Sequence, residues 1–157
     1  MLGETNPQAQ AGRPAAVDAH SQGVAYAVEW TDALRVGNEV IDTDHEVFVA
    51  EVNAAVAASD EDFPKHFAEL VEHTRAHFAR EEAIMDATGF FATGIHKAEH
   101  QRVLAEVARV ADRLEAGDAT FARSYVAEHL PAWFRQHRDT MDLATATFAR
   151  QAGHTSL

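Results

Sequence analysis

The chain has 157 residues, of which 46% are apolar and 24% are charged, a balance typical of one globular domain. Thirteen Lys and Arg against 25 Asp and Glu give a formal net charge of −12, which opposes binding to nucleic acid or to an anionic membrane. Because there is no Cys, disulfides, iron–sulfur clusters and thiolate zinc sites are excluded, and any metal needs nitrogen and oxygen ligands. No apolar run approaches the ~20 residues of a membrane span, and no apolar signal core is seen at the N-terminus. We therefore expect a cytoplasmic protein.

The N-terminal segment differs from the rest of the chain. Residues 1–24 are rich in Ala, Gly, Gln and Pro and show no apolar periodicity, which predicts a flexible N-terminal extension. From Tyr26 onward no stretch alternates like a strand, and four segments carry apolar residues at helical spacing. We therefore expect one folded domain over residues 25–157.

The first two predicted helices are recognised by their ends. One is expected at roughly 39–58, where a Ser-Asp pair ends the run. The second is expected to begin after a side-chain cap at Asp62, with Pro64 in its first turn, where a missing N–H costs nothing. Gly89, in the stretch ATGFFATG, is expected to end this helix.

Two further helices follow after short connections. The third is predicted from about Thr93 to a stop at Gly117, and the fourth begins after a cap at Asp118. Pro131 lies inside the fourth and removes the hydrogen bond to the carbonyl of Ala127, so we expect a kink or a break between these residues. Four amphipathic helices joined in this way favour an all-α fold, an antiparallel up-down-up-down four-helix bundle.

Histidine is unusually abundant, with 10 residues in the chain. Residues four apart lie on the same face of a helix and can bind one ion, and three such pairs occur: His73 with His77, His77 with Glu81, and His96 with His100. Imidazole and carboxylate groups inside a core are costly unless they are paired or bound to metal. Each predicted helix places at least one in an apolar stripe; these groups are His45, His77, Glu81, His96, His100 and His137. The pattern favours a metal site inside the bundle.

These residues belong to a longer pattern. Its members in chain order are Trp30, Val36-Gly37, Ile41-Asp42, His45, His77-Phe78, Glu81-Glu82, Met85, His96, His100, Trp133, His137 and Asp142. Over about residues 26–148 their order and spacing resemble those of the bacterial hemerythrins.

The resemblance implies a cofactor of two non-haem iron ions joined by an oxo or hydroxo group. The implied ligands are His96, His100 and His137 on one iron, His45 and His77 on the other, and Glu81 and Asp142 as bridges. The two-histidine iron then has an open position for dioxygen. The implied function is reversible dioxygen binding, in oxygen storage, delivery or sensing.

Helical geometry alone does not select Asp142. It lies five residues after His137, about 140° around a regular helix, and Met141 takes the i+4 position. Only the resemblance supplies Asp142 as a bridge. A local π-bulge would reconcile the spacing, and Asp139 is the rival on sequence alone.

Four further residues are expected around the site. Phe134 stands where the family usually has Leu, one turn before His137, and would either narrow the oxygen pocket as a lid or simply fill the core. His73 stands where a Tyr is common and is expected beside the ligands, with a surface position as the alternative. Trp133 and Trp30 are expected to pack around the site rather than to react.

The ligand types favour a binding protein over an enzyme. Five neutral imidazoles with two carboxylates stabilise high oxidation states less than a carboxylate-rich cage does, and the Glu-x-x-His pairs of ferritin-like oxidases are absent from the chain. The alternatives are a di-iron enzyme that reduces peroxide or nitric oxide or oxidises iron, and a structural zinc site. We expect dioxygen as the partner, no nucleic-acid or membrane partner, and a monomer.

Overall fold

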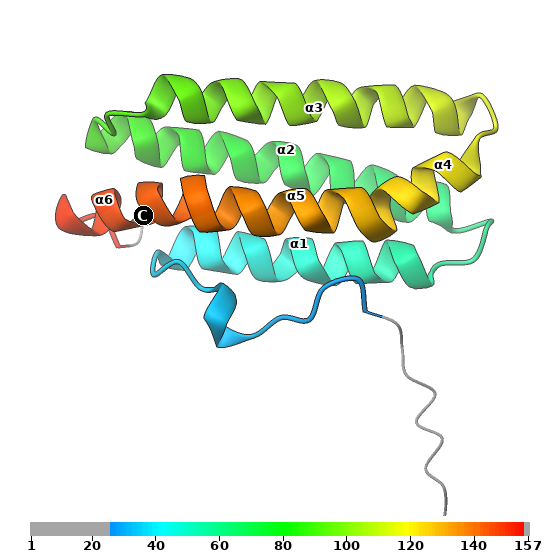
Figure 1. Ribbon diagram of the computed structural model, residues 1–157, viewed down its shortest axis with the longest axis horizontal. Coiled ribbons are helices and arrows are strands. Elements are labelled where there is room, and N and C mark those ends of the chain that lie inside the picture. The colour runs from blue at the N-terminus through cyan, green and yellow to red at the C-terminus, as the bar shows by residue number, and fades with distance from the viewer. Residues whose placement is uncertain (1–25, 156–157) are drawn as a thin grey trace, which may run out of the picture.

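A computed structural model describes residues 26–155, and these residues form the predicted four-helix bundle (Figure 1). The bundle has four helical rods, each running along its length. Three of them are single helices: α1 (Glu39–Ala57), α2 (Phe63–Thr88) and α3 (Thr93–Glu115). The fourth combines α4 (Ala119–Ser124), α5 (Leu130–His137) and α6 (Leu143–Gln151). No strand occurs within the described part of the chain, so the all-α prediction is confirmed. None of the helices in that part has the length and apolar character to cross a membrane.

The fourth rod stays helical because two π-helical turns join its three α-helices. They cover Tyr125–His129 and Arg138–Asp142, and each closes with an i→i+5 backbone bond. The helix therefore does not break between Ala127 and Pro131; the wider turn at 125–129 absorbs the missing N–H of the proline. The fourth rod nevertheless changes direction there: Figure 1 shows the ribbon of α4 inclined to that of α5.

The helix ends follow the sequence signals with one exception. Gly89 and Gly117 adopt positive φ angles of 67° and 94° after α2 and α3, and the carboxylate of Asp118 accepts from the N–H of Phe121 at the start of α4. The prediction that the Asp62 side chain caps α2 is wrong. Asp62 already has helical backbone angles, and its carboxylate accepts from the Ser59 hydroxyl instead.

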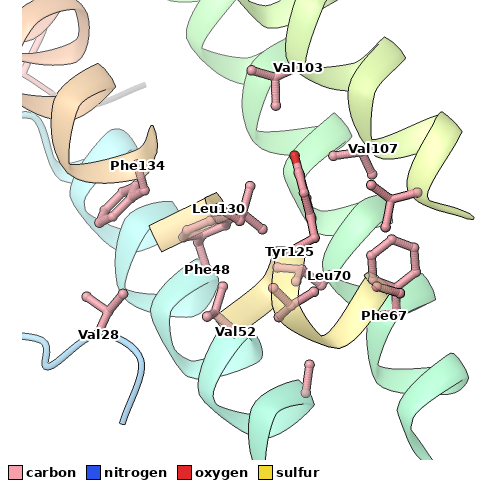
Figure 2. Close-up of a cluster of buried hydrophobic side chains, with 14 of the residues drawn as sticks. Val28, Phe48, Val52, Phe67, Leu70, Val103, Val107, Tyr125, Leu130 and Phe134 are labelled. Carbon is pink, nitrogen blue, oxygen red and sulfur yellow. The ribbon is translucent and has the colours of Figure 1, made fainter. Parts of the chain in front are cut away.

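Two hydrophobic clusters fill the bundle. The larger extends from the polar residues toward the α4 end, and Figure 2 shows part of it; the rings of Phe134 of α5 and Phe48 of α1 have centroids 5.0 Å apart. The smaller lies toward the opposite end and contains Val36, Ile41, Ile84, Ala146 and Ala149. On α1, α2 and the fourth rod, buried polar residues lie between apolar residues of the two clusters, and on α3 they precede those of the larger cluster. The bundle therefore has a polar layer inside its core.

An extended segment before α1 packs along that helix. The Asn53 side chain accepts from the N–H groups of Ala27 and Val28 and donates to the carbonyl of Val28. Val28 is buried as a result. The extension predicted at residues 1–24 lies outside the described residues, so the expected boundary at residue 25 stays a prediction.

Asn38 connects the N-terminus of α1 to the segment that follows α6. Its side-chain oxygen accepts from the N–H groups of Val40 and Ile41, and its amide donates to the carbonyl of His154. We expect Asn38→Ala to lower the free energy of unfolding by about 1–2 kcal/mol, the usual cost of a lost helix cap with a further bond. Urea unfolding followed by circular dichroism measures this change.

Asn38→Ser is the matched variant, because its hydroxyl keeps an uncharged cap oxygen while the bond to the carbonyl of His154 is lost. Its loss of stability should fall between wild type and Asn38→Ala. Equal stability of wild type and the Ala variant would contradict the role of the cap.

Candidate metal centre

Seven buried polar side chains meet in the layer between the two hydrophobic clusters. They come from all four rods: His45 of α1, His77 and Glu81 of α2, His96 and His100 of α3, His137 of α5 and Asp142 of the second π-helical turn. Each is at most 5% exposed. These are the seven residues predicted as ligands, and the structure brings all of them together.

Their ligand atoms fall into two groups that share Asp142. The first combines Glu81, His96, His100, His137 and Asp142, and the second combines His45, His77 and Asp142. The Oδ1 of Asp142 lies 2.9 Å from Nε2 of His137 and 3.1 Å from Nε2 of His96, while its Oδ2 lies 3.0 Å from Nε2 of His45. Asp142 therefore spans the two groups.

The carboxylate of Glu81 also faces both groups. Its Oε2 lies 3.4 Å from Nε2 of His100, 3.7 Å from Nε2 of His96 and 3.6 Å from Nε2 of His77. The arrangement offers three imidazole nitrogens on one side and two on the other, with two carboxylates between them.

The second π-helical turn aims Asp142 at this layer. The wide turn over Arg138–Asp142 accommodates one additional residue, so Asp142 takes the inward place that Met141 would occupy on a regular α-helix. Met141 is only half-buried, whereas Asp142 is 1% exposed. The rival Asp139 lies at the surface and forms an ion pair with Arg138. The geometry favours Asp142.

Three of the five imidazoles are oriented by residues that the sequence analysis did not assign to this role. The carboxylate of Asp44 accepts from Nδ1 of His77 at 3.2 Å. Thr145 Oγ1 lies 2.8 Å from Nδ1 of His96, and Glu82 Oε1 lies 3.0 Å from Nδ1 of His100. With Nδ1 turned outward to an acceptor, Nε2 carries its lone pair into the layer, as a metal ligand must.

The inward-facing atoms fit a cation better than they fit one another. Among the described residues, no hydrogen bond reaches either carboxylate oxygen of Glu81 or of Asp142, or Nε2 of His45 or of His100. Nε2 of His96 lies 3.0 Å from Nε2 of His137, although both nitrogens are expected to present lone pairs. Buried groups of this kind are costly unless a positive charge lies between them. The donor set suits a metal that accepts imidazole and carboxylate.

The pKa values of the two carboxyl groups are shifted in opposite directions in the metal-free protein. Burial, reinforced by the nearby Asp142, raises the pKa of Glu81 well above its ordinary value. Burial alone would also raise the pKa of Asp142, but the imidazole of His137, with those of His45 and His96, holds it well below the usual range. Asp142 is therefore the more acidic of the two carboxyl groups, and Glu81 is the one that keeps its proton to higher pH.

Burial also keeps two of the imidazoles neutral. It lowers the pKa of His77 to about 4, against the opposing effect of Asp44. It lowers the pKa of His100 to about 2, with help from His96 and His137. Neutral imidazole is the form that binds metal, so at neutral pH these two residues need not lose a proton first.

Aromatic rings close the layer on the side of the larger cluster. Phe78 stacks on the imidazole of His100 with centroids 3.8 Å apart, Trp133 stacks on that of His137 at 4.7 Å, and Phe134 meets His45 edge-on at 5.1 Å. The Trp133 indole N–H donates to Glu99. A cavity of about 10 Å³ lies between these rings and His45, His77, His137 and Asp142. This volume is close to that of one water-sized molecule.

The other two predicted neighbours lie farther out. His73 donates from Nε2 to the carbonyl of Asp44 at 3.0 Å and so touches the backbone next to His45. Trp30 does not line the cavity. It packs against the outside of the larger cluster, with the Arg35 guanidinium 5.9 Å from its ring centroid.

In the metal-free protein, we expect Glu81→Gln to raise the free energy of unfolding at pH 8. Because the folded-state pKa of Glu81 lies above its unfolded value, its stabilising contribution is present at low pH and is lost as the pH rises through the folded pKa. Gln carries no charge at any pH, so the advantage of the variant should shrink toward pH 5. Urea unfolding after chelation, at both pH values, measures the difference.

Glu72→Gln, an exposed position on the same helix, is the control and should show no such dependence. The explanation would be contradicted if Glu81→Gln were less stable than wild type at pH 8. It would also be contradicted if the gain in the free energy of unfolding were the same at pH 8 and pH 5.

Comparison with known proteins gives a consistent result. Residues 36–146 match the family model described as the Hemerythrin HHE cation binding domain. The chain is 38% identical to a bacteriohemerythrin of Ralstonia nicotianae over 80% of its own length and 91% of that protein. It is 29% identical to myohemerythrin-1 of Phascolopsis gouldii, over 64% of this chain and 83% of the relative. No solved structure shows significant similarity to the chain. On the family model and on the extent of the first of these similarities, the chain belongs to the hemerythrin family.

Proposed function

We propose that the protein binds dioxygen reversibly at a non-haem di-iron centre, in oxygen storage, delivery or sensing. In this proposal His96, His100 and His137 hold one iron and His45 and His77 the other. Glu81 and Asp142 bridge the two, together with an oxo or hydroxo group. We also propose that the protein acts as a monomer in the cytoplasm and is not an enzyme.

One observation carries the proposal: the nitrogens are divided three to two around Asp142, and the small cavity is lined by both histidines of the group of two but by only His137 of the group of three. His45 and His77 both line that cavity. A metal held there by fewer protein ligands keeps a position for a small molecule, whereas a structural site is closed by its ligands. The cavity, which is close in size to one water molecule, supports only a very small ligand.

When bound, the two irons supply the electrons and the open position that dioxygen requires. The chain's own residues supply the surroundings. Phe134, Phe78 and Trp133 present apolar ring surfaces to the cavity and limit the entry of water. The predominance of neutral imidazole over carboxylate disfavours high oxidation states, which supports reversible binding over oxygen activation.

The direct test uses protein purified with its native metal. Iron is counted per chain, the protein is reduced without air, and the visible spectrum is followed as oxygen is admitted and withdrawn. We expect two irons per chain and absorption bands that appear with oxygen and vanish on its removal. Immediate decay to an oxidised form with turnover of peroxide or nitric oxide would replace the proposal with the enzymatic alternative, and a colourless zinc protein would contradict both.

Phe134 is expected to limit exchange between the cavity and solvent. Its ring packs against His45 and Phe48 and is 3% exposed. We expect Phe134→Leu to release oxygen several-fold faster and to autoxidise faster, because the smaller side chain opens the cavity. Stopped-flow absorbance and the lifetime of the oxygenated spectrum give the two rates.

Phe67→Leu provides the matched control, since Phe67 is equally buried and packs against Phe63, away from the cavity. It should leave both rates unchanged. Equal rates in the Phe134 variant and wild type would show that this ring only fills the core.

A further inference from the structure

Asp44 makes an unusual set of contacts behind one of the proposed ligands. It lies on α1 next to His45, with its side chain 10% exposed. Its Oδ2 accepts from Nδ1 of His77 at 3.2 Å and from Nε of Arg80 at 2.7 Å, and its Oδ1 accepts from Nη2 of Arg80 at 2.7 Å. The guanidinium thus holds the carboxylate by two parallel bonds, a geometry that fixes both groups.

The other ligands have different surroundings on their outer sides. The partner of His96 is the neutral hydroxyl of Thr145, and the partner of His100 is Glu82, whose side chain is 23% exposed. Nδ1 of His45 and of His137 has no hydrogen-bond partner in the part of the chain that the structure describes. Among the five proposed histidine ligands, only His77 therefore faces a carboxylate that is itself clamped by an arginine within the described residues.

We propose that Asp44 and Arg80 act together as positioning residues for His77, with opposite effects on its strength as a ligand. This inference rests on the proposed function, since it assigns a tuning device to the two-histidine side of that centre.

The opposite effects follow from the direction of the hydrogen bonds. A carboxylate that accepts the Nδ1 proton fixes the tautomer and makes Nε2 a stronger donor to a metal. Arg80 draws on the same Oδ2 that accepts from His77, so the guanidinium reduces the negative charge available to the imidazole. Asp44 therefore strengthens the ligand, and Arg80 moderates that effect. Because His77 lines the small cavity, the balance acts where dioxygen is proposed to bind.

The first test uses the metal-free protein and needs no iron. Nitrogen-15 NMR of the histidine side chains reports which nitrogen of His77 carries the proton and how strongly it is hydrogen-bonded. In wild type we expect the Nδ1 proton of His77 to resonate at low field. In Asp44→Asn this resonance should move to higher field and both tautomers of His77 should be populated. In Arg80→Gln it should move to still lower field than in wild type. Arg80→Lys keeps the charge but not the paired bonds, so its proton should lie between those of wild type and Arg80→Gln.

The second test uses the loaded protein. We expect Asp44→Asn to weaken binding of the metal ion held by His45 and His77 about 10–100-fold, the usual effect of losing an outer partner of a ligand. The same variant should raise the reduction potential of the iron centre. Arg80→Gln should lower the potential. Glu82→Gln changes the outer partner of His100 instead of that of His77, so it should leave the His77 proton unchanged.

The outcomes separate this inference from the proposed function. If wild type takes up iron and binds oxygen reversibly, but Asp44→Asn leaves the His77 proton and the affinity for the metal ion held by His45 and His77 unchanged, the positioning role is wrong and the function stands. Potentials that shift in the same direction in Asp44→Asn and Arg80→Gln would also overturn it. If wild type fails to bind oxygen, the function fails, while the NMR experiment still decides whether Asp44 orients His77.

Discussion

The structure depends on the cost of placing seven polar side chains inside a helical core. Two carboxylates and five imidazoles lie between two hydrophobic clusters, shielded from solvent. Their inward atoms lie close together without satisfying one another. Such a layer is tolerated when a cation compensates it. The hydrophobic clusters on either side then hold the four rods in the geometry that the layer requires.

The fourth rod resolves a conflict between regular helical geometry and the needs of this layer. The π-helical turn at 138–142 rotates Asp142 inward and gives the bundle a carboxylate opposite Glu81. The turn at 125–129 lets the same rod continue past Pro131. Each turn gives up regular hydrogen bonding over a few residues, as π-bulges at functional sites commonly do. Local irregularity in one rod therefore allows all four to contribute to a single site.

Much of the fold and of the candidate site could be predicted from the sequence because the signals are local. The stripe that carries His77 and Glu81 depends on helical spacing, and the stop at Gly117 depends on one residue's backbone preference. Asp142 was different, since its inward position needs a π-turn that no local spacing specifies. The hydrogen bond between Asp44 and His77 joins residues 33 positions apart, so only the packing of α1 on α2 shows it. Trp30 lies outside the cavity for the same reason: its place depends on the path of the extended segment rather than on the distance to His45 along the chain.

The central claim is that this polar layer holds two metal ions in unequal surroundings. A crystal structure of the iron-loaded protein, with anomalous diffraction recorded on both sides of the iron absorption edge, tests it most directly. We predict two iron peaks, one among Nε2 of His96, His100 and His137 and the other at His45 and His77, with Glu81 and Asp142 contacting both. A single peak, or a metal bound through Asp139 in place of Asp142, would contradict it.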